Sequence, residues 1–173
     1  HAEIELGLTY FFTGNYSKAE KIFSISLKKS EKNNNQKAIA HCFNNLGLIF
    51  KNQNNYKKAI EYYKKALIVG EKLGDILFVA KSLNNLGLVE FHQIQYNKAI
   101  KYYRRSLKIK EDLEDQRGIA ATLHNCALVY KNQGDYLLAF ESMERSLKIY
   151  IDIGAQKEIS DIYYNMGNHL MQY

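Results

Sequence analysis

The segment Asn44-Asn45-Leu46-Gly47-Leu48 returns unchanged, 40 residues later, as Asn84-Asn85-Leu86-Gly87-Leu88. The same frame holds Leu6-Gly7-Leu8 upstream and Asn125-Cys126-Ala127-Leu128 downstream. A fixed period of this length is the sequence signature of a repeat protein, in which each unit stacks on its neighbours. The chain is therefore expected to be an array of similar units.

A second block of residues recurs with the same 40-residue step. A tyrosine precedes an alanine by three positions, and a large side chain follows that alanine by four. Both blocks keep the same period without an insertion, which excludes a chance match. The copies are Tyr16, Ala19 and Phe23; Tyr56, Ala59 and Tyr63; Tyr96, Ala99 and Tyr103; and Tyr136, Ala139 and Met143.

Each unit contains two stretches with apolar residues at three- and four-residue spacing, which predicts two helices. In the second unit, Asn54-Asn55 separates the helices and Gly74-Asp75 follows the second one. Because Gly47 lacks a side chain, two antiparallel helices can approach closely, and Tyr63 fills the space beside it. Neither helix can bury its apolar face alone, so the units must stack and leave a concave wall.

This pattern resembles the tetratricopeptide repeat (TPR) over essentially the whole chain. Two features depart from the family: the period is 40 rather than 34, and the usual closing proline is missing, since the chain has no proline. Longer helices joined by a Gly-Asp turn account for both. The resemblance rests on Phe43, Leu46-Gly47, Phe50, Tyr56, Ala59, Tyr63 and Ala66.

The resemblance implies an all-α fold, a right-handed α-solenoid of antiparallel helix pairs. We expect a single TPR array over residues 1–173, with repeats at about 1–39, 40–79, 80–119 and 120–159 and a partial or capping helix at 160–173. The ends of a solenoid need polar caps. Apolar residues at both ends, such as Leu6 and Tyr163, Met166 and Leu170, therefore predict self-association through an end or continuation into a larger protein.

The family also implies partner binding, with the first helix of each pair lining the concave groove. We expect a protein- or peptide-binding scaffold or adaptor. The alternative is the ligand- or peptide-sensing region of a larger signalling regulator, such as a transcription factor, histidine kinase or cyclase. Carrying the groove positions over gives the candidate site residues His41, Asn44, Leu48, Lys51, Asn52, Lys81, Asn84, Leu88, Phe91, His92, His124, Leu128, Lys131 and Asn132.

The chemistry of these candidates suits a peptide. Asn44 and Asn84 can donate and accept hydrogen bonds at once, as a peptide group requires. Lys51 and Lys131 can meet acidic side chains or a terminal carboxylate. Two alternatives stay open at this stage: the leucines can pack between adjacent first helices, and the lysines can form an ordinary solvated face.

Two further positions are assigned to structure rather than to binding. The row Asn45, Asn85, Asn125 and Asn165 is expected to form hydrogen bonds between neighbouring helices. Glu90 occupies a slot filled elsewhere by apolar residues such as Phe50. Since an unpaired buried carboxylate is costly, it marks either a functional position or, as we favour, a local rotation of the helix that brings Phe91 inward.

Other functional classes find little support. The only His/Cys neighbours lie at spacings that do not direct both groups to one site on a helix, so no metal, cofactor or catalytic residue is expected, and the protein is not expected to be an enzyme. Cys42 and Cys126 stand far apart, as reduced thiols of a cytoplasmic protein do. No apolar run is long enough to span a bilayer. The net charge of +6 is spread along the chain, which favours acidic partners but not nucleic acid.

Overall fold

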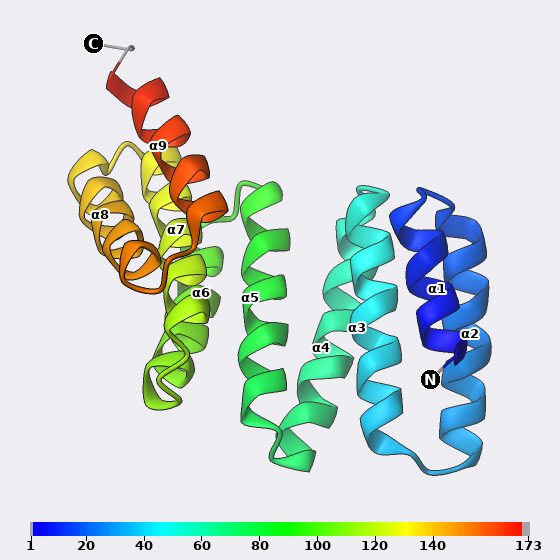
Figure 1. Ribbon diagram of the computed structural model, residues 1–173. Helices are drawn as coiled ribbons and strands as arrows, with labels where there is room; N and C mark the ends of the chain where they lie inside the picture. Colours follow the sequence, from blue (N-terminus) through cyan, green and yellow to red (C-terminus); the bar gives the residue numbers. More distant parts are fainter. Residues whose placement is uncertain (1, 171–173) are drawn as a thin grey trace.

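The computed structural model describes the backbone of residues 2–170 and the side chains of residues 3–163. Within this part the chain forms nine helices and no strand, arranged as consecutive antiparallel pairs (Figure 1). The pairs begin four residues before the repeat boundaries expected at 40, 80 and 120. The helices are α1 (Ala2–Phe12), α2 (Tyr16–Lys32), α3 (Gln36–Asn52), α4 (Tyr56–Leu73), α5 (Ile76–His92), α6 (Tyr96–Asp112), α7 (Gln116–Gln133), α8 (Tyr136–Asp152) and α9 (Gln156–Leu170).

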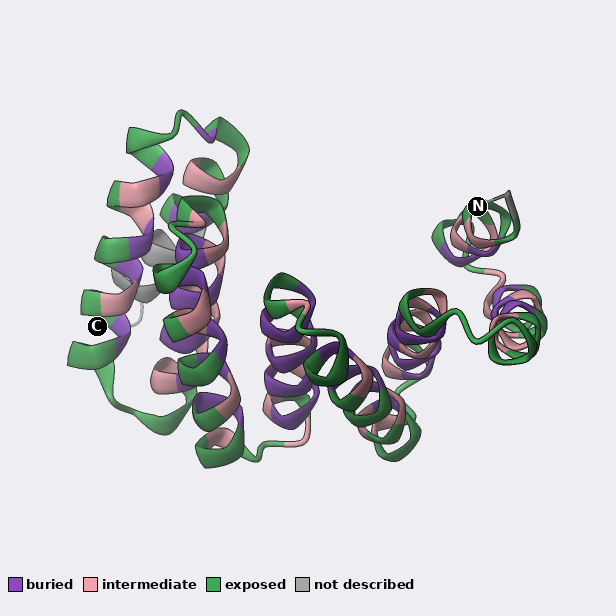
Figure 2. Ribbon diagram, turned by 90° about the horizontal axis from the view of Figure 1, so that it is seen from below, coloured by how far each residue is buried: buried purple, intermediate pink, exposed green. Residues whose placement is uncertain are grey.

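The predicted all-α solenoid is confirmed. Each helix packs on the next along the chain, and the first helices α3, α5 and α7 also lie beside one another. The pairs follow a curve and also turn relative to one another, so that Figure 2 shows the N-terminal pair end-on and the C-terminal pairs from the side. No helix in the described part is long and apolar enough to cross a membrane.

Every helix-to-helix turn has one residue in the left-handed region, and these residues recur every 20 positions. At five of these turns the side chain of the next residue caps the following helix; Asn55 Oδ1, for example, accepts a hydrogen bond from the Lys58 backbone N–H. This chemistry ends each helix abruptly without proline. The left-handed residues are Gly14, Asn34, Asn54, Gly74, Ile94, Glu114, Gly134 and Gly154.

Ile94 is the only β-branched residue among these left-handed residues, and a stabilising substitution is expected there. Its φ is +62°, a conformation that a β-branched side chain adopts only at a cost of about 1–2 kcal/mol. The side chain is 69% exposed, so its removal gives up little packing. Ile94→Gly should therefore raise the free energy of unfolding by about 1 kcal/mol, measured by urea denaturation. Gly134→Ala, at the same place one repeat later, should lower it by a similar amount, and equal signs for the two variants would contradict this account.

The close packing predicted inside each pair is present. A Cβ atom added to Gly47 would lie 2.7 Å from the Tyr63 ring, and one added to Gly87 would lie 2.6 Å from the Tyr103 ring. Both tyrosines are almost completely buried. Glycine in the first helix therefore lets the second helix bring its aromatic ring against the backbone.

Glu90 keeps its slot in the core, and the helical rotation favoured from the sequence is wrong. Leu86 and Val89 are fully buried, as Leu46 is one repeat earlier, so the register of α5 is unchanged. Glu90 itself is 6% exposed. Phe91, the next residue, is half-buried and lies 5.9 Å from the Tyr96 ring, so it packs on the following helix without displacing Glu90.

Apolar side chains are exposed near both ends of the array. Leu6 is exposed at the N-terminal end, at a position where Leu46 and Leu86 are buried against a preceding pair. Tyr163 on α9 is exposed, while the side chains of Met166 and Leu170 lie outside the described residues. Self-association through these ends stays a prediction.

Candidate functional site

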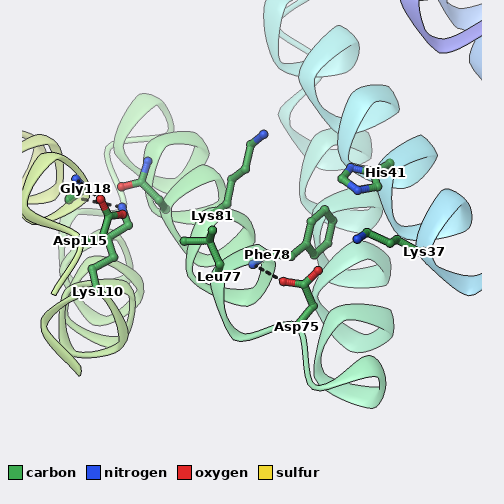
Figure 3. A pocket seen from close by; sticks show the side chains of 10 residues that line it. Lys37, His41, Asp75, Leu77, Phe78, Lys81, Lys110, Asp115 and Gly118 are labelled. Carbon is green, nitrogen blue, oxygen red and sulfur yellow. Dashed lines mark hydrogen bonds between the residues drawn. The ribbon is translucent and has the colours of Figure 1, made fainter. Parts of the chain in front are cut away.

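A pocket of about 510 Å³ crosses three consecutive first helices near the turns that precede them. Figure 3 shows residues from α3 and the start of α5 on one side, residues from α6 and α7 on the other, and Leu77 and Lys81 of α5 between them. The cavity thus runs across the helices and along the array. Its lining residues are Lys37, His41, Asp75, Leu77, Phe78, Lys81, Asn84, Lys110, Asp115 and Gly118.

Three residues assigned to the groove from the sequence meet in this pocket: His41, Lys81 and Asn84. The His41 ring lies edge-on to Phe78, with ring centroids 5.1 Å apart. Burial lowers the pKa of His41, and the neighbouring charges of Lys81 and Lys37 lower that pKa further. The lowered pKa favours the neutral imidazole, which offers one donor and one acceptor.

The pocket carries more basic than acidic side chains. Lys37, Lys81 and Lys110 face two aspartates, both of which cap helices: Asp75 Oδ1 accepts from the Phe78 N–H at 3.0 Å, and Asp115 Oδ1 accepts from the Gly118 N–H at 2.9 Å. Each carboxylate interacts with the backbone N–H groups at the N-terminus of a helix. Three lysines outnumber these two aspartates, so the cavity carries a surplus of positive charge.

The asparagine rows join adjacent first helices. Asn85 Nδ2 donates to Asn44 Oδ1 at 2.9 Å, and Asn125 Nδ2 donates to Asn84 Oδ1 at 3.3 Å. The structural role predicted for the row of Asn85 and Asn125 is confirmed, while the side chain of Asn165 lies outside the described residues. Asn44 is only 5% exposed. Its carbonyl oxygen is also already engaged by Asn85. Both observations make Asn44 less suited to ligand binding than the sequence indicated.

The leucine row lies at the boundary between groove and core. Leu8, Leu48, Leu88 and Leu128 are all half-buried. Leu48 packs against the cluster formed by α1, α2 and α3, so packing between helices accounts for part of its surface. Each of these leucines therefore keeps part of its apolar surface exposed on a first helix.

The candidates near the ends of the first helices form a separate group, away from the pocket. Lys51 is half-buried, and this burial lowers the pKa of its ammonium. His92 stacks on the Tyr56 ring at 5.9 Å, and burial followed by the charge of Lys51 lowers its pKa. Asn132 Nδ2 donates to the backbone oxygen of Leu128 at 2.7 Å, which occupies part of its carboxamide.

The remaining candidates of this group are Asn52, Phe91 and Lys131. Asn52 is exposed, while Phe91 and Lys131 are half-buried. His124, nearer the middle of α7, has a buried Nδ1 with no hydrogen-bond partner among the described residues. Burial lowers the pKa of His124, opposed by the charge of Asp161.

Seven pocket residues were missed from the sequence because they lie outside the groove positions of the family. Lys37, Leu77 and Phe78 start first helices, Asp75 and Asp115 cap them, and Gly118 is in the first turn of α7. The seventh, Lys110, belongs to a second helix. The sequence did contain a signal: at this position the other repeats have the uncharged residues Ser30, Gly70 and Tyr150, so a charged lysine departs from the pattern.

Neither a metal centre nor an activated thiol is present in the described part of the chain. No group of three or more His, Cys, Asp or Glu side chains is arranged to hold a metal there. Burial raises the pKa of Cys42 to about 11 and that of Cys126 to about 12. Both thiols are buried and free, so neither acts as a thiolate near neutral pH.

Comparison with known sequences identifies the family. The profile of the tetratricopeptide repeat matches residues 1–69 and 78–152, which is most of the chain. The chain belongs to the tetratricopeptide repeat family. No curated protein matches it significantly.

Solved structures with the TPR arrangement are similar over most of the chain. BtubC (BKLC) from P. vanneervenii has 28% identity and a TM-score of 0.80, over 88% of this chain and 63% of BtubC. A Rap protein complexed with competence and sporulation factor has 16% identity and a TM-score of 0.85, over 92% of this chain and 45% of that protein. The fold is shared, while the chain spans less than two thirds of either protein.

A third similar structure is a signal transduction ATPase with numerous domains that carries a tetratricopeptide repeat sensor, PH0952 from Pyrococcus horikoshii. It has 22% identity and a TM-score of 0.84, over 92% of this chain and 25% of that protein. At this identity the likeness concerns the TPR fold alone.

Proposed function

We propose that this TPR array is a protein- or peptide-binding module and that its ligand lies along the first helices, across the pocket between α3 and α7. The observation that carries the proposal is the pocket itself, because it crosses three repeats and contains His41, Lys81 and Asn84. A cavity that extends across helices suits an extended chain better than a compact small molecule. The Rap protein of similar fold, which is complexed with a factor, supports the same use of the array.

The groove offers the contacts that a polypeptide needs. The half-buried leucines provide apolar surface, the Nδ2 group of Asn84 provides a donor, and the imidazole of His41 provides a donor and an acceptor. Lys131 and Lys51 place positive charge farther along the first helices, which favours a ligand with acidic residues. No catalytic role is proposed, and the buried, protonated thiols are consistent with a cytoplasmic setting.

The test is a selection of binding peptides from a random 12-residue display library, followed by affinity measurements on groove variants. His92→Ala and Lys131→Ala should each weaken binding about fivefold, because each contact contributes about 1 kcal/mol. Lys64→Ala and Lys108→Ala, exposed positions on the second helices, are the matched controls and should change affinity less than twofold. Selected peptides that bind both groove variants like the wild type, with the variants folded, would refute the groove assignment.

A second candidate function is the sensing region of a larger signalling regulator. The multidomain ATPase with a TPR sensor favours it, because this chain matches about a quarter of that protein. An output domain, such as a DNA-binding, kinase or cyclase domain, in the same polypeptide would decide for the regulator. The peptide-binding surface would be the same in both cases, and only its consequence would differ.

A further inference from the structure

Lys110 is a buried lysine that no carboxylate neutralises directly. It lies on α6, is 8% exposed, and lines the pocket. Its Nζ donates to Thr122 Oγ1 at 2.7 Å and to the Gly118 backbone oxygen at 3.3 Å. Neither acceptor is charged, and Lys110 is in no salt bridge among the described residues. Because an ammonium has three hydrogens, one remains for a further acceptor.

The equivalent junction one repeat earlier is filled by an apolar side chain instead of a lysine. There the slot holds Gly70, and the ring of Phe78 fills the space above it: a Cβ on Gly70 would lie 2.8 Å from that ring. In the Lys110 junction the sizes are reversed: a Cβ on Gly118 would meet the Asp115 carboxylate first and would lie 3.0 Å from Lys110 Cδ. The space beside the first turn of the first helix thus holds an aromatic ring in one junction and the charged side chains of Lys110 and Asp115 in the next.

A buried ammonium costs more than an aromatic ring at such a place. Removing the charge from water is unfavourable unless a charged partner compensates for it. Asp115, the aspartate whose charge acts on Lys110, uses Oδ1 to cap α7. Burial lowers the pKa of Lys110, with Asp115 opposing that effect only in part. Among the described residues the charge of Lys110 is compensated only in part, and this is the feature that favours a ligand.

The rest of the pocket fits the partner that such a lysine lacks. Lys37 and Lys81 add positive charge at its edge, and Leu77 and Phe78 form an apolar wall (Figure 3). A carboxylate on a short aliphatic stem would match both features, since its oxygens meet the ammonium groups and its methylenes meet the wall. Asp75, the other aspartate in the lining, already caps α5 through Oδ1.

We propose that this pocket holds an aspartate or glutamate side chain of the bound peptide and that Lys110 donates to its carboxylate from the buried side. The inference rests on the proposed peptide-binding function and specifies what the ligand places between α3 and α7. The charge of Lys110 is then the determinant of specificity, because a neutral amide in the same place would leave it uncompensated.

The direct test uses two small probes on the whole chain. N-acetyl-glutamate N-methylamide and its glutamine counterpart are titrated into ¹⁵N-labelled protein, and the amide signals of Gly118 and Thr122 are followed by NMR. We expect saturable shifts with the glutamate probe and at least tenfold weaker binding of the glutamine probe. Equal binding of the two probes, or no shift with either at tens of millimolar, would overturn the proposal.

Lys110→Met supplies the matched substitution, because it keeps the length of the side chain and removes its charge. It should weaken the glutamate probe at least tenfold and abolish the difference between the probes. Lys101→Met, at an exposed position on the same helix, should leave both unchanged. A folded Lys110→Met variant that still prefers glutamate would refute the role of Lys110. If that variant does not fold, the comparison of the two probes on the wild type decides.

The outcome is separable from that of the proposed function. If peptides selected by display lose affinity with His92→Ala and Lys131→Ala but are indifferent to replacement of their acidic residues by amides, peptide binding stands and the acidic-residue pocket falls. If the glutamate probe binds at Gly118 and Thr122 while no selected peptide depends on the groove residues, the pocket stands and the groove assignment falls.

Discussion

Replacing Tyr63 with alanine is expected to lower the free energy of unfolding by about 3–5 kcal/mol, the usual cost of removing a buried aromatic ring. Tyr63 on α4 is 0% exposed and belongs to a cluster that joins α3, α4 and α5. Its ring covers the backbone of α3 at Gly47, so that no other side chain can fill the space. The loss is measured by urea denaturation followed by circular dichroism.

Tyr63→Phe is the matched control, because it keeps the ring and removes only the hydroxyl. The Tyr63 hydroxyl is buried and finds no hydrogen-bond partner among the described residues. Removing an unsatisfied buried polar group should leave stability unchanged or raise it by up to about 1 kcal/mol. A loss of more than 1 kcal/mol in the phenylalanine variant would show that the hydroxyl has a partner. A small loss in the alanine variant would show that the ring does not hold the repeats together.

The sequence was sufficient to predict the fold because the features that define it repeat. Gly47 and Tyr63 recur as Gly87 and Tyr103 with the same spacing, and they make the same contact in the structure. The role of the asparagine row was also predictable, since Asn85 and Asn125 each donate to an asparagine of the preceding first helix. Periodic positions show the role of a residue several times over in one chain.

The candidate site was predictable only in part, because its decisive features are exceptions to the period. His41, Lys81 and Asn84 came from positions on the first helices. Lys110 lies on a second helix, and Gly118 leaves room at the junction for both Lys110 and the Asp115 carboxylate. Such a pair of complementary sizes lies across a junction between repeats, and it becomes visible only when both helices are placed.

The prediction that the helix rotates at Glu90 was wrong for a related reason. The expectation of a rotated helix assumed that a carboxylate would leave the core when a neighbouring phenylalanine could replace it. The packing of Leu86 and Val89 fixes the register of α5. The cost of turning these side chains outward exceeds the gain from exposing one carboxylate, so Glu90 follows its helix into the core.

Alkaline pH should destabilise the fold strongly, and the two cysteines provide the reason. Burial raises the pKa of Cys126 to about 12 and of Cys42 to about 11, from an ordinary value of 9.0. Above pH 9 the unfolded chain therefore releases thiol protons that the folded chain keeps, and stability falls as the pH rises. Between pH 9 and 11 each thiol should remove roughly 2–3 kcal/mol, at about 1.4 kcal/mol per pH unit.

Two other kinds of buried group act over the same range. Burial also raises the pKa of Tyr63 and Tyr103, which adds to the loss of stability above pH 10. Lys110 acts in the opposite direction, because its pKa is lowered in the folded state and the unfolded chain holds its proton longer. Lys51, whose pKa burial also lowers, acts in the same direction as Lys110. Stability should still fall, since these two lysines oppose two thiols and two phenols.

The contribution of one thiol can be isolated by comparing Cys126→Ala with the wild type at pH 8 and at pH 11, under reducing conditions. The variant lacks the group that titrates, so its loss of stability between the two pH values should be smaller by roughly 2–3 kcal/mol. Its lower stability at pH 8 cancels in this comparison, as does the general repulsion of charges at high pH. Identical pH dependence in the two proteins would mean that the Cys126 thiol ionises as readily in the folded chain as in the unfolded one, and that the junction between α6 and α7 is open to water.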